Sequence, residues 1–279
     1  MSGHNAFRAL IYLALLGLAA DLSPALAAVR DPHVLVVCAD PNNLPFSNRA
    51  GQGFENRIAE LVAHAMNVRV RYVWWAQRRG YVRNTLTKSQ CDLWPGVASG
   101  VDTVATTDPY YRSTYVFVTR AKDPLTGLTL DDPRLRSLIV GVQMIGNEAM
   151  NTPPAHALAR RGITQNVRGY TVYGDYEQPN PPARIIAAVG TGALDVALVW
   201  GPVAGYFCEK SPVKLRIEAV TPAVDAGVWP MAYDIAVGVD RAQPELRARV
   251  NEILRSHQMA INEILHRFHV PLSGGAEPR

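Results

Sequence analysis

The chain has 279 residues, of which 48% are hydrophobic, so it can bury a core in one large domain or in two lobes. Its formal charge of +4 comes from 28 basic and 24 acidic residues spread along the chain. The sequence lacks a dense run of Lys and Arg that would mark a nucleic-acid-binding surface, whereas mild basicity is compatible with an acidic ligand or an acidic protein partner.

The first 27 residues have the pattern of a secretory signal peptide. Residues 9–20 are apolar but too few to span a bilayer comfortably, and Ala25-Leu26-Ala27 offers the small residues that a signal peptidase recognises. We therefore expect a mature, soluble chain that begins at Ala28 and works in the periplasm. An uncleaved membrane anchor is the alternative.

Three cysteines remain after this segment, Cys38, Cys91 and Cys208. In an oxidising compartment one pair could form a bridge and leave one thiol. Cys38 lies near the end of one predicted strand and Cys91 at the start of another. If these strands are parallel neighbours, the two sulfur atoms are staggered too far apart, so the sequence favours the absence of a Cys38–Cys91 bridge.

The stretch from Val34 to Phe46 is the one around which the chain is organised. Its apolar run ends abruptly at Asp40-Pro41-Asn42-Asn43, which is typical of a buried parallel strand that opens into a turn. In open α/β sheets, ligands lie at the carboxyl ends of the strands. This turn is therefore a candidate binding element.

Hydrophobic periodicity predicts two rounds of alternating strands and helices. The first has a helix over 54–66, a strand over 68–73, a short helix over 81–87 and a strand over 92–97. The second has strands over 137–142, 167–173 and 194–200, with helices over 155–161 and 182–189. Both rounds end in an Asp, an apolar strand and a Gly turn, Asp92…Gly96 and Asp195…Gly201, which favours two lobes of similar build with parallel sheets.

The C-terminal part predicts a strand over 231–239 and helices over 244–254 and 259–268. Because these helices have apolar faces that need a sheet, we expect them to return to the first lobe. Two strands then cross between the lobes, one over 115–120 and one near Tyr233. The predicted fold class is α/β, with two parallel-sheet lobes joined by two crossover strands: residues 28–117 and 232–279 form lobe 1, and residues 118–231 form an inserted lobe 2.

This pattern resembles a type II periplasmic solute-binding protein over nearly all of the mature chain. The matching strings are Gly53-Phe54-Glu55, Asp108-Pro109-Tyr110-Tyr111, Tyr233-Asp234-Ile235-Ala236-Val237 and Pro244-Glu245-Leu246. Longer strings, over 38–48, 53–56, 74–80, 82–86 and 106–113, resemble the solute-binding-like accessory proteins that are associated with pyrroloquinoline-quinone (PQQ) methanol and alcohol dehydrogenases.

The resemblance implies a non-catalytic periplasmic protein that assists assembly, activation or electron transfer of a quinoprotein dehydrogenase, with its cytochrome c as a further candidate partner. The alternative is a receptor that delivers a small solute to an ABC transporter. Amino-acid-binding relatives carry an Arg nine residues before the Pro-Tyr pair, which clamps the ligand carboxylate. Gly100 occupies that position here, so an amino-acid ligand is not expected.

Candidate binding residues follow the ends of the predicted strands, where aromatic rings can stack on a ligand or a partner and Arg can bind carboxylates. They are Asp40, Asn42, Asn43, Phe46, Trp75, Arg78, Arg79, Gly96, Tyr110, Tyr111, Arg112, Gln143, Asn147, Asp175 and Trp200. Each Arg taken singly is more often a solvated surface charge, and one Trp of the pair Trp74-Trp75 is expected in the core.

Signatures of common enzymes are absent from the sequence: it has no Gly-x-Ser-x-Gly, no His-Glu-x-x-His and no P-loop. A few proteins of the resembled fold are dehydratases, and that activity would need an acid with a perturbed pKa in the cleft, for which Asp40 or Asp175 is the best candidate. His266 and His269 could share a helix face, but without a third ligand nearby we expect no metal and no cofactor.

Overall fold

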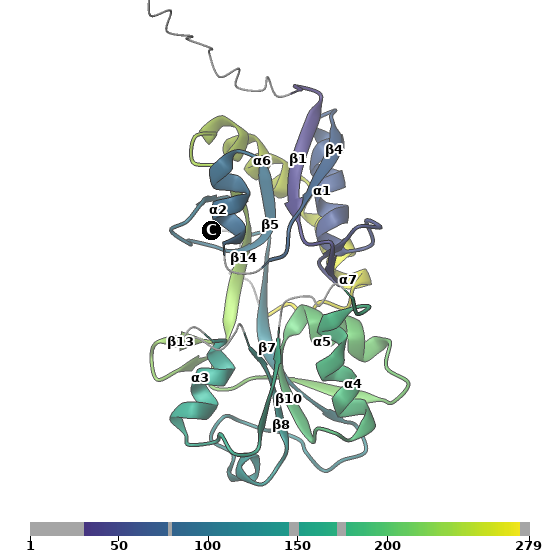
Figure 1. Cartoon of the computed structure of the whole chain (residues 1–279), viewed down its shortest axis with the longest axis vertical. Helices are drawn as coiled ribbons and strands as arrows, with labels where there is room; N and C mark the ends of the chain where they lie inside the picture. Colours follow the sequence, from purple (N-terminus) through teal and green to yellow (C-terminus); the bar gives the residue numbers. More distant parts are fainter. Residues whose placement is uncertain (1–30, 78–79, 145–150, 172–176, 274–279) are drawn as a thin grey trace, which may run out of the picture. The chain divides into compact units, whose positions relative to one another are not determined.

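The computed structural model describes residues 31–77, 80–144, 151–171 and 177–273 (Figure 1). The predicted signal peptide lies outside these ranges, so its cleavage stays a prediction. In the same ranges, helices of the length and apolarity needed to cross a membrane are absent.

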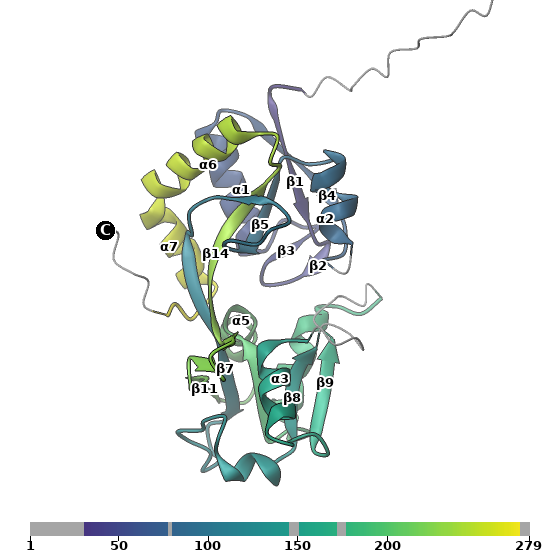
Figure 2. The same ribbon diagram turned by 90° about the vertical axis from the view of Figure 1, so that its left-hand side faces the viewer.

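The first lobe is built on three parallel strands in the order β4-β1-β5, namely β4 (Arg69–Trp74), β1 (Val34–Ala39) and β5 (Leu93–Ala98). Successive residues of β1 point to opposite faces of the sheet, and both faces are covered. Leu35 and Val37 share a hydrophobic core with residues of α1 (Phe54–Ala65), α6 (Pro244–Ser256) and α7 (Gln258–Arg267). Figure 2 shows these three helices together on one side of the sheet. The predicted return of the last two helices to the first lobe is therefore confirmed.

The opposite face of β1 carries Val36 and Cys38, which pack with Tyr81 of α2 (Tyr81–Asn84) and with Leu86. A short 3₁₀ helix, η1 (Leu86–Lys88), follows α2. The single short helix that the sequence predicted over 81–87 is thus divided in two at Thr85, whose hydroxyl donates to the Tyr81 carbonyl at 2.6 Å.

The second lobe repeats this plan with the order β9-β8-β10, all parallel: β9 (Val167–Thr171), β8 (Val140–Met144) and β10 (Val196–Trp200). One face is covered by α3 (Pro153–Arg160). The other is covered by α4 (Arg184–Thr191) and α5 (Gly201–Glu209).

The two lobes share one kind of hydrogen bond, from a backbone N–H of the central strand region to an Asp carboxylate. In the first, the N–H of Val36 donates to the Asp92 carboxylate at 2.8 Å, and in the second the N–H of Ile139 donates to the Asp195 carboxylate at 2.8 Å. The sequence separation is 56 residues in both pairs. The predicted echo between Asp92 and Asp195 therefore has a common structural cause: each carboxylate holds the start of the central strand beside the next strand.

Two long antiparallel strands connect the lobes. β7 (Tyr111–Arg120) pairs through Tyr111–Thr114 with β14 (Ala232–Val239), and through 115–120 with β10 and β11 (Leu215–Ala219). The crossover strands thus also pair with each other, and they join both sheets into one continuous path. The lobe boundaries at residues 117/118 and 231/232 stay a prediction.

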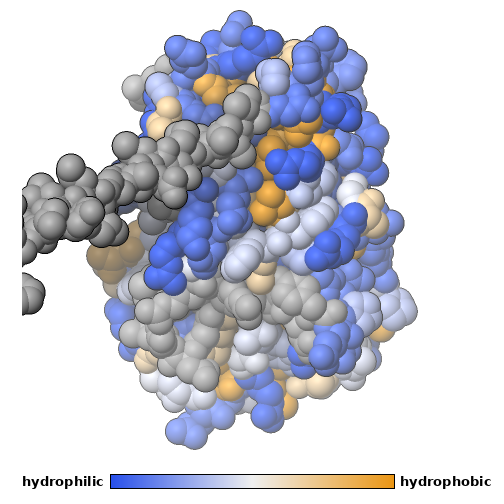
Figure 3. Space-filling model, turned by 45° about the horizontal axis from the view of Figure 1, so that its top comes forward, coloured by the Kyte–Doolittle hydropathy of each residue, from blue (hydrophilic) through white to orange (hydrophobic). Residues whose placement is uncertain are grey.

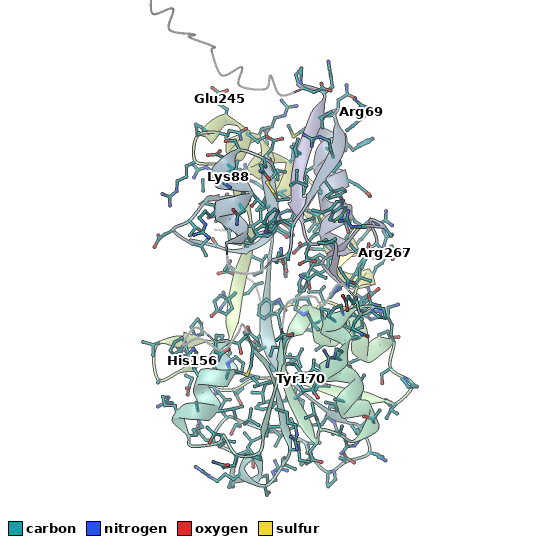
Figure 4. All side chains as sticks on the ribbon, in the orientation of Figure 1. Arg69, Lys88, His156, Tyr170, Glu245 and Arg267 are labelled. Atoms are coloured by element: carbon teal, nitrogen blue, oxygen red, sulfur yellow. A yellow bond between two sulfur atoms is a disulfide. The ribbon has the colours of Figure 1, made fainter. Side chains whose placement is uncertain are left out.

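Short elements complete the fold. They are β2 (Asn42–Asn43), β3 (Ser47–Asn48), β6 (Ala105–Thr106), β12 (Val224–Asp225), β13 (Trp229–Pro230), η2 (Pro133–Arg136) and η3 (Pro181–Ala183). The β12–β13 hairpin packs against α3, where the His156 ring stacks on the Trp229 ring with 4.2 Å between the centroids (His156 is labelled in Figure 4). Beneath it, the buried Asp225 carboxylate accepts hydrogen bonds from Arg160 and Arg161 at 2.9 and 2.7 Å.

The prediction that Cys38 and Cys91 do not bond is wrong. They form a disulfide with 5.6 Å between their Cα atoms, and Cys208 is the free cysteine. The prediction placed Cys91 in a strand with ideal parallel register. Instead, Cys91 precedes β5, and the N–H of Asp92 donates to the Val36 carbonyl at 2.7 Å, so the chain enters the sheet in a turn that brings Cys91 onto the same face as Cys38.

Candidate functional site

A cavity of about 310 Å³ lies between the two lobes beside the crossover strands. We call it the central cavity. Nine of its residues come from the first lobe and the crossover region next to it: Asn43, Phe46, Glu55, Gln77, Gly96, Ala98, Tyr111, Tyr233 and Ile235. The others are Tyr115, Gln143, Thr152, Pro182, Trp200 and Val203.

Aromatic rings dominate the wall of the central cavity. Phe46 comes from the turn after β1, Tyr111 and Tyr115 from β7, Trp200 from the end of β10 and Tyr233 from β14. The Trp200 ring meets Tyr115 and Tyr233 edge-on, at 5.1 and 6.0 Å between centroids. Such edge-to-face pairs fix the rings in place. The wall is therefore a preformed set of aromatic faces and edges that belongs to both lobes.

Glu55 is the acidic group of this wall, with 4% of its surface exposed. Glu55 is the second residue of α1, and its backbone N–H donates to the Phe46 carbonyl at 2.9 Å, which holds this end of the helix in place. Gly53 permits this docking because a Cβ there would overlap the Phe46 carbonyl. Burial is the main factor that raises the pKa of the Glu55 carboxyl well above its ordinary value, and the charge of Asp40 adds to the effect.

Gly96 of β5 lies directly against the Glu55 carboxyl. Its φ of +77° is in the left-handed region, and a Cβ at this position would overlap a carboxyl oxygen of Glu55. The prediction of a Gly turn at the end of this strand needs correction, since β5 continues through Gly96 to Ala98. The glycine is required because the carboxyl fills the space of its missing side chain.

Glu55 was not among the predicted site residues, although the sequence contains a signal for it. Glu55 precedes Ala59 by four residues and Val62 by seven, and all three are buried on one face of α1. An acidic residue on the buried stripe of a helix needs a partner or a function. The sequence had instead suggested Asp40 and Asp175 as candidate acids. Asp175 lies outside the described residues, and the Asp40 carboxylate accepts hydrogen bonds from backbone N–H groups.

Asp40 is buried at the carboxyl end of β1, where it organises the turn. Its carboxylate accepts from the N–H of Asn42 at 2.9 Å and from the N–H of Gln77 at 2.8 Å. Asn43 adds a second link, since its amide donates to the Gln77 side chain at 3.0 Å. Gln143 has the matching place at the end of β8, where its side-chain oxygen accepts from the N–H of Trp200 at 2.7 Å. Asn43 and Gln143 both line the central cavity.

A second, wider depression of about 740 Å³ lies at the outer edge of the lobes, and we call it the outer groove. It is lined by Pro41, Asn42, Arg49, Trp74, Trp75, Ala76, Glu177, Gln178 and Pro179. The Asn42 side chain bridges the lobes by donating to the Gln178 carbonyl at 2.9 Å. Trp75 is 38% exposed.

The prediction that one Trp of the adjacent pair lies in the core is wrong. Trp74 is only partly buried. Its ring stacks on Tyr72, with 4.7 Å between the ring centroids, and the Arg49 guanidinium lies 5.8 Å from its centroid.

Tyr110 is 3% exposed in the core of the first lobe and does not line the central cavity. Arg112 pairs with Asp234 across the crossover strands at 2.8 Å.

Four candidate residues, Arg78, Arg79, Asn147 and Asp175, lie outside the described residues. Gly100, at the place of the expected carboxylate clamp, lies in an exposed turn after β5. Among the described residues of the central cavity, Lys and Arg are absent from the wall. His269 follows the end of α7, so it does not share a helix face with His266, and the described ranges contain no group of three His, Cys, Asp or Glu that could hold a metal ion.

No protein-family profile matches the chain. Protein MoxJ of Methylorubrum extorquens is 33% identical over 253 residues, which is 88% of this chain and 84% of that protein. The crystal structure of the periplasmic binding protein XoxJ from Methylobacterium extorquens AM1 has 34% identity and a TM-score of 0.70, and covers 86% of this chain and 100% of its own. The crystal structure of MxaJ from Methlophaga aminisulfidivorans MPT has 25% identity and a TM-score of 0.75, with the same coverage. With these likenesses over most of its length, the chain belongs to the MoxJ family, a group of proteins with the type II periplasmic-binding-protein fold.

Proposed function

We propose that this protein is a non-catalytic periplasmic accessory protein of a PQQ-dependent methanol or alcohol dehydrogenase, which assists the assembly, activation or electron-transfer partnership of that enzyme. Membership of the MoxJ family carries the proposal. The sequence strings that resemble dehydrogenase-associated proteins include the turn after β1 and the string 74–80, and both contribute to the outer groove.

The composition of the cavity wall supports this role over that of an amino-acid receptor. Receptors of that kind hold the carboxylate of the ligand with a bidentate Arg. The described wall of the central cavity has no basic residue, and Gly100 stands where such an Arg is expected. A free amino acid would therefore bring its carboxylate next to Glu55 without a compensating cation.

The outer groove has the composition of a protein-docking surface. Trp74, Trp75 and Arg49 lie together there, and Trp and Arg are the residue types that dominate interface hot spots. On the side drawn in Figure 3, hydrophilic residues predominate among the described ones and hydrophobic residues form a few separate areas. We therefore place the contact with an acidic segment of the dehydrogenase at the outer groove, and Arg78 and Arg79, which follow its Trp pair in the sequence, are the candidates for the charged part of the contact.

The test is direct binding to the purified quinoprotein methanol dehydrogenase of the same organism, measured by calorimetry at two salt concentrations. The Arg78→Glu/Arg79→Glu double variant should bind more weakly, by a few kcal/mol, and with less dependence on salt. Arg247→Glu/Arg249→Glu makes the same charge change on exposed positions of α6 and should leave the affinity unchanged.

Three results contradict the proposal in different ways. Absence of binding by the wild-type chain at about 100 μM would remove the partnership. Equal losses in both double variants would show a general charge effect and remove the outer groove as the contact. A clear rise in melting temperature with a common amino acid would instead support a receptor, since a ligand at a hundred times its dissociation constant stabilises by about 2.7 kcal/mol.

A further inference from the structure

The central cavity combines a buried acid with aromatic walls, and the accessory role proposed above does not use this combination. Glu55 is 4% exposed and lines the cavity. Among the described residues, its carboxyl has no hydrogen-bond donor and no ion-pair partner. A carboxyl that is buried in this way without a partner is costly unless something else compensates it.

The charge of the described wall has one sign. Glu55 is its acidic member, Asp40 lies behind it at the end of β1, and basic side chains are absent from the described lining. The polar groups that remain on the wall are the amides of Asn43, Gln77 and Gln143 and the hydroxyls of Tyr and Thr. Such a wall has no cation to compensate an anionic ligand, and it has one acid that can ionise beside a positive charge.

The aromatic rings add a second preference for a cation. Phe46, Tyr111, Tyr115, Trp200 and Tyr233 surround the same space. The faces of aromatic rings attract cations through the quadrupole of the ring, and groups of such rings recognise alkylated ammonium ions. The cavity of about 310 Å³ is at the lower end of the range for small-ligand sites, so it suits a compact ligand.

We propose that the central cavity binds a small organic cation of the alkylammonium type, with Glu55 as its counter-ion and the aromatic wall around its alkyl groups. Gly96 leaves the space that places the carboxyl at the wall, and α1 holds it there through the Phe46 carbonyl. The site is distinct from the outer groove, and its ligand binding is measured on the isolated chain. Failure of this inference therefore leaves the partnership with a dehydrogenase untouched, and the reverse is also true.

Burial raises the pKa of the Glu55 carboxyl, so we expect the binding of a cation to release a proton from this group. Four groups face it: Asp40 from the turn after β1, Tyr72 from β4, Tyr110 just before β7 and Tyr111 at the start of β7. Burial raises the pKa values of these three tyrosines above their ordinary value, so their hydroxyls keep their protons at neutral pH. Affinity for an ammonium ion should therefore increase as the pH rises from 5 to 8.

The experiment compares three probes of nearly equal shape and different charge: tert-butylammonium, tert-butanol and trimethylacetate. Methylammonium and trimethylammonium extend the series to smaller ions. Calorimetry in two buffers with different enthalpies of ionisation gives the affinity and the number of protons released. We expect at least one ammonium ion to bind at least about tenfold more tightly than tert-butanol, with proton release, and trimethylacetate not to bind.

Glu55→Gln keeps the shape of the side chain and removes its charge, so it should weaken ammonium binding by about tenfold or more and abolish the proton release. Glu60→Gln is the matched control, since Glu60 is an exposed acid of the same helix that pairs with Arg57 at 3.1 Å. It should leave the affinity within about twofold of the wild type. If Glu55→Gln does not fold, Tyr233→Leu tests the aromatic part: it should weaken the binding of the ammonium ion and not that of tert-butanol.

Two outcomes overturn the inference. One is the absence of binding by all three ammonium ions at 10 mM. The other is equal affinity for tert-butylammonium and tert-butanol, which would make the cavity an apolar pocket in which the charge of Glu55 has no role.

Discussion

Loss of the Cys38–Cys91 disulfide should lower the free energy of unfolding by about 4 kcal/mol. The bridge joins residues 53 positions apart. A cross-link over a loop of this length removes about 14 cal/mol/K of conformational entropy from the unfolded chain, which is about 4 kcal/mol at 25 °C. Both cysteines are fully buried in the core beneath α2, so truncation of their side chains adds a packing loss of the same sign.

The existence of the bridge is tested first. Alkylation of the denatured, unreduced protein should label one thiol, that of Cys208, and reduction before alkylation should raise the number to three. Urea unfolding of the Cys38→Ala/Cys91→Ala variant is then compared with that of the wild type and of Cys208→Ala, a control in which the bridge is intact. The change in free energy follows from the shift of the midpoint multiplied by the slope m.

Two results would refute the reasoning. Three labelled thiols in the unreduced protein would show that the bridge is absent. A loss of less than about 1 kcal/mol in the double variant would show that the unfolded chain is already constrained between these residues, so that the loop-entropy calculation does not apply.

Three further predictions concern charges and backbone. Asp225→Asn should destabilise the protein by about 2–4 kcal/mol in urea unfolding, because it leaves Arg161 without its buried partner. Asp131→Asn is the control, since it removes an exposed partner of the same Arg161, and it should cost less than about 0.5 kcal/mol. The arginines lower the pKa of Asp225, so its contribution should be present at neutral pH and decline as the pH falls below about 3.8. For Glu55 the stability changes with pH in the opposite direction. Its pKa is raised in the folded state, so the stability that it contributes is lost as the pH rises above about 4.5. Thermal melts from pH 5 to 8 should therefore show Glu55→Gln becoming more stable relative to the wild type. Gly96→Ala should lower the melting temperature and displace the Glu55 carboxyl, because a side chain there has both a left-handed φ and a direct overlap.

The sequence could predict the strands, the helices and the return of the chain, because these follow from hydrophobic periodicity. β1 and α1 have strong patterns and appear at the predicted places, and α6 and α7 were assigned to the right lobe from their unpaired apolar faces. The similarity of the two lobes was visible in the order of an Asp, an apolar strand and a Gly turn that begins at Asp92 and again at Asp195.

What the sequence could not predict depended on close approach in three dimensions. The sequence pattern predicted a Gly turn at Gly201, whereas Gly201 and Pro202 begin α5, since Pro is favoured in the first turn of a helix. Gly201 is needed there because a Cβ would lie 2.6 Å from the Thr114 carbonyl of β7. Likewise, no pattern in the sequence shows that the turn at Asp92 brings Cys91 to Cys38.

The duplicated frame explains which residues give the central cavity its chemistry. Val36 and Ile139 are equivalent in the two lobes, and Asp40 and Gln143 follow them at the same distance, each at the end of the central strand of its lobe. Both side chains are occupied by their own lobe, since Asp40 accepts from the N–H of Gln77 and Gln143 from that of Trp200. The duplicated positions therefore hold loops in place.

Specificity must then come from parts that are not duplicated. These are Glu55 on α1, the glycine at position 96 that makes room for it, and the tyrosines of the crossover strands. Tyr111 and Tyr233 lie on strands that connect the lobes, so a cation between them would contact both lobes and the connection itself. A ligand that contacts both lobes stabilises the arrangement of the lobes to which it binds. The gain in free energy is RT ln(1 + [L]/Kd), which is about 2.7 kcal/mol when the ligand concentration is a hundred times the dissociation constant. Occupation of the central cavity would thereby favour this arrangement of the lobes.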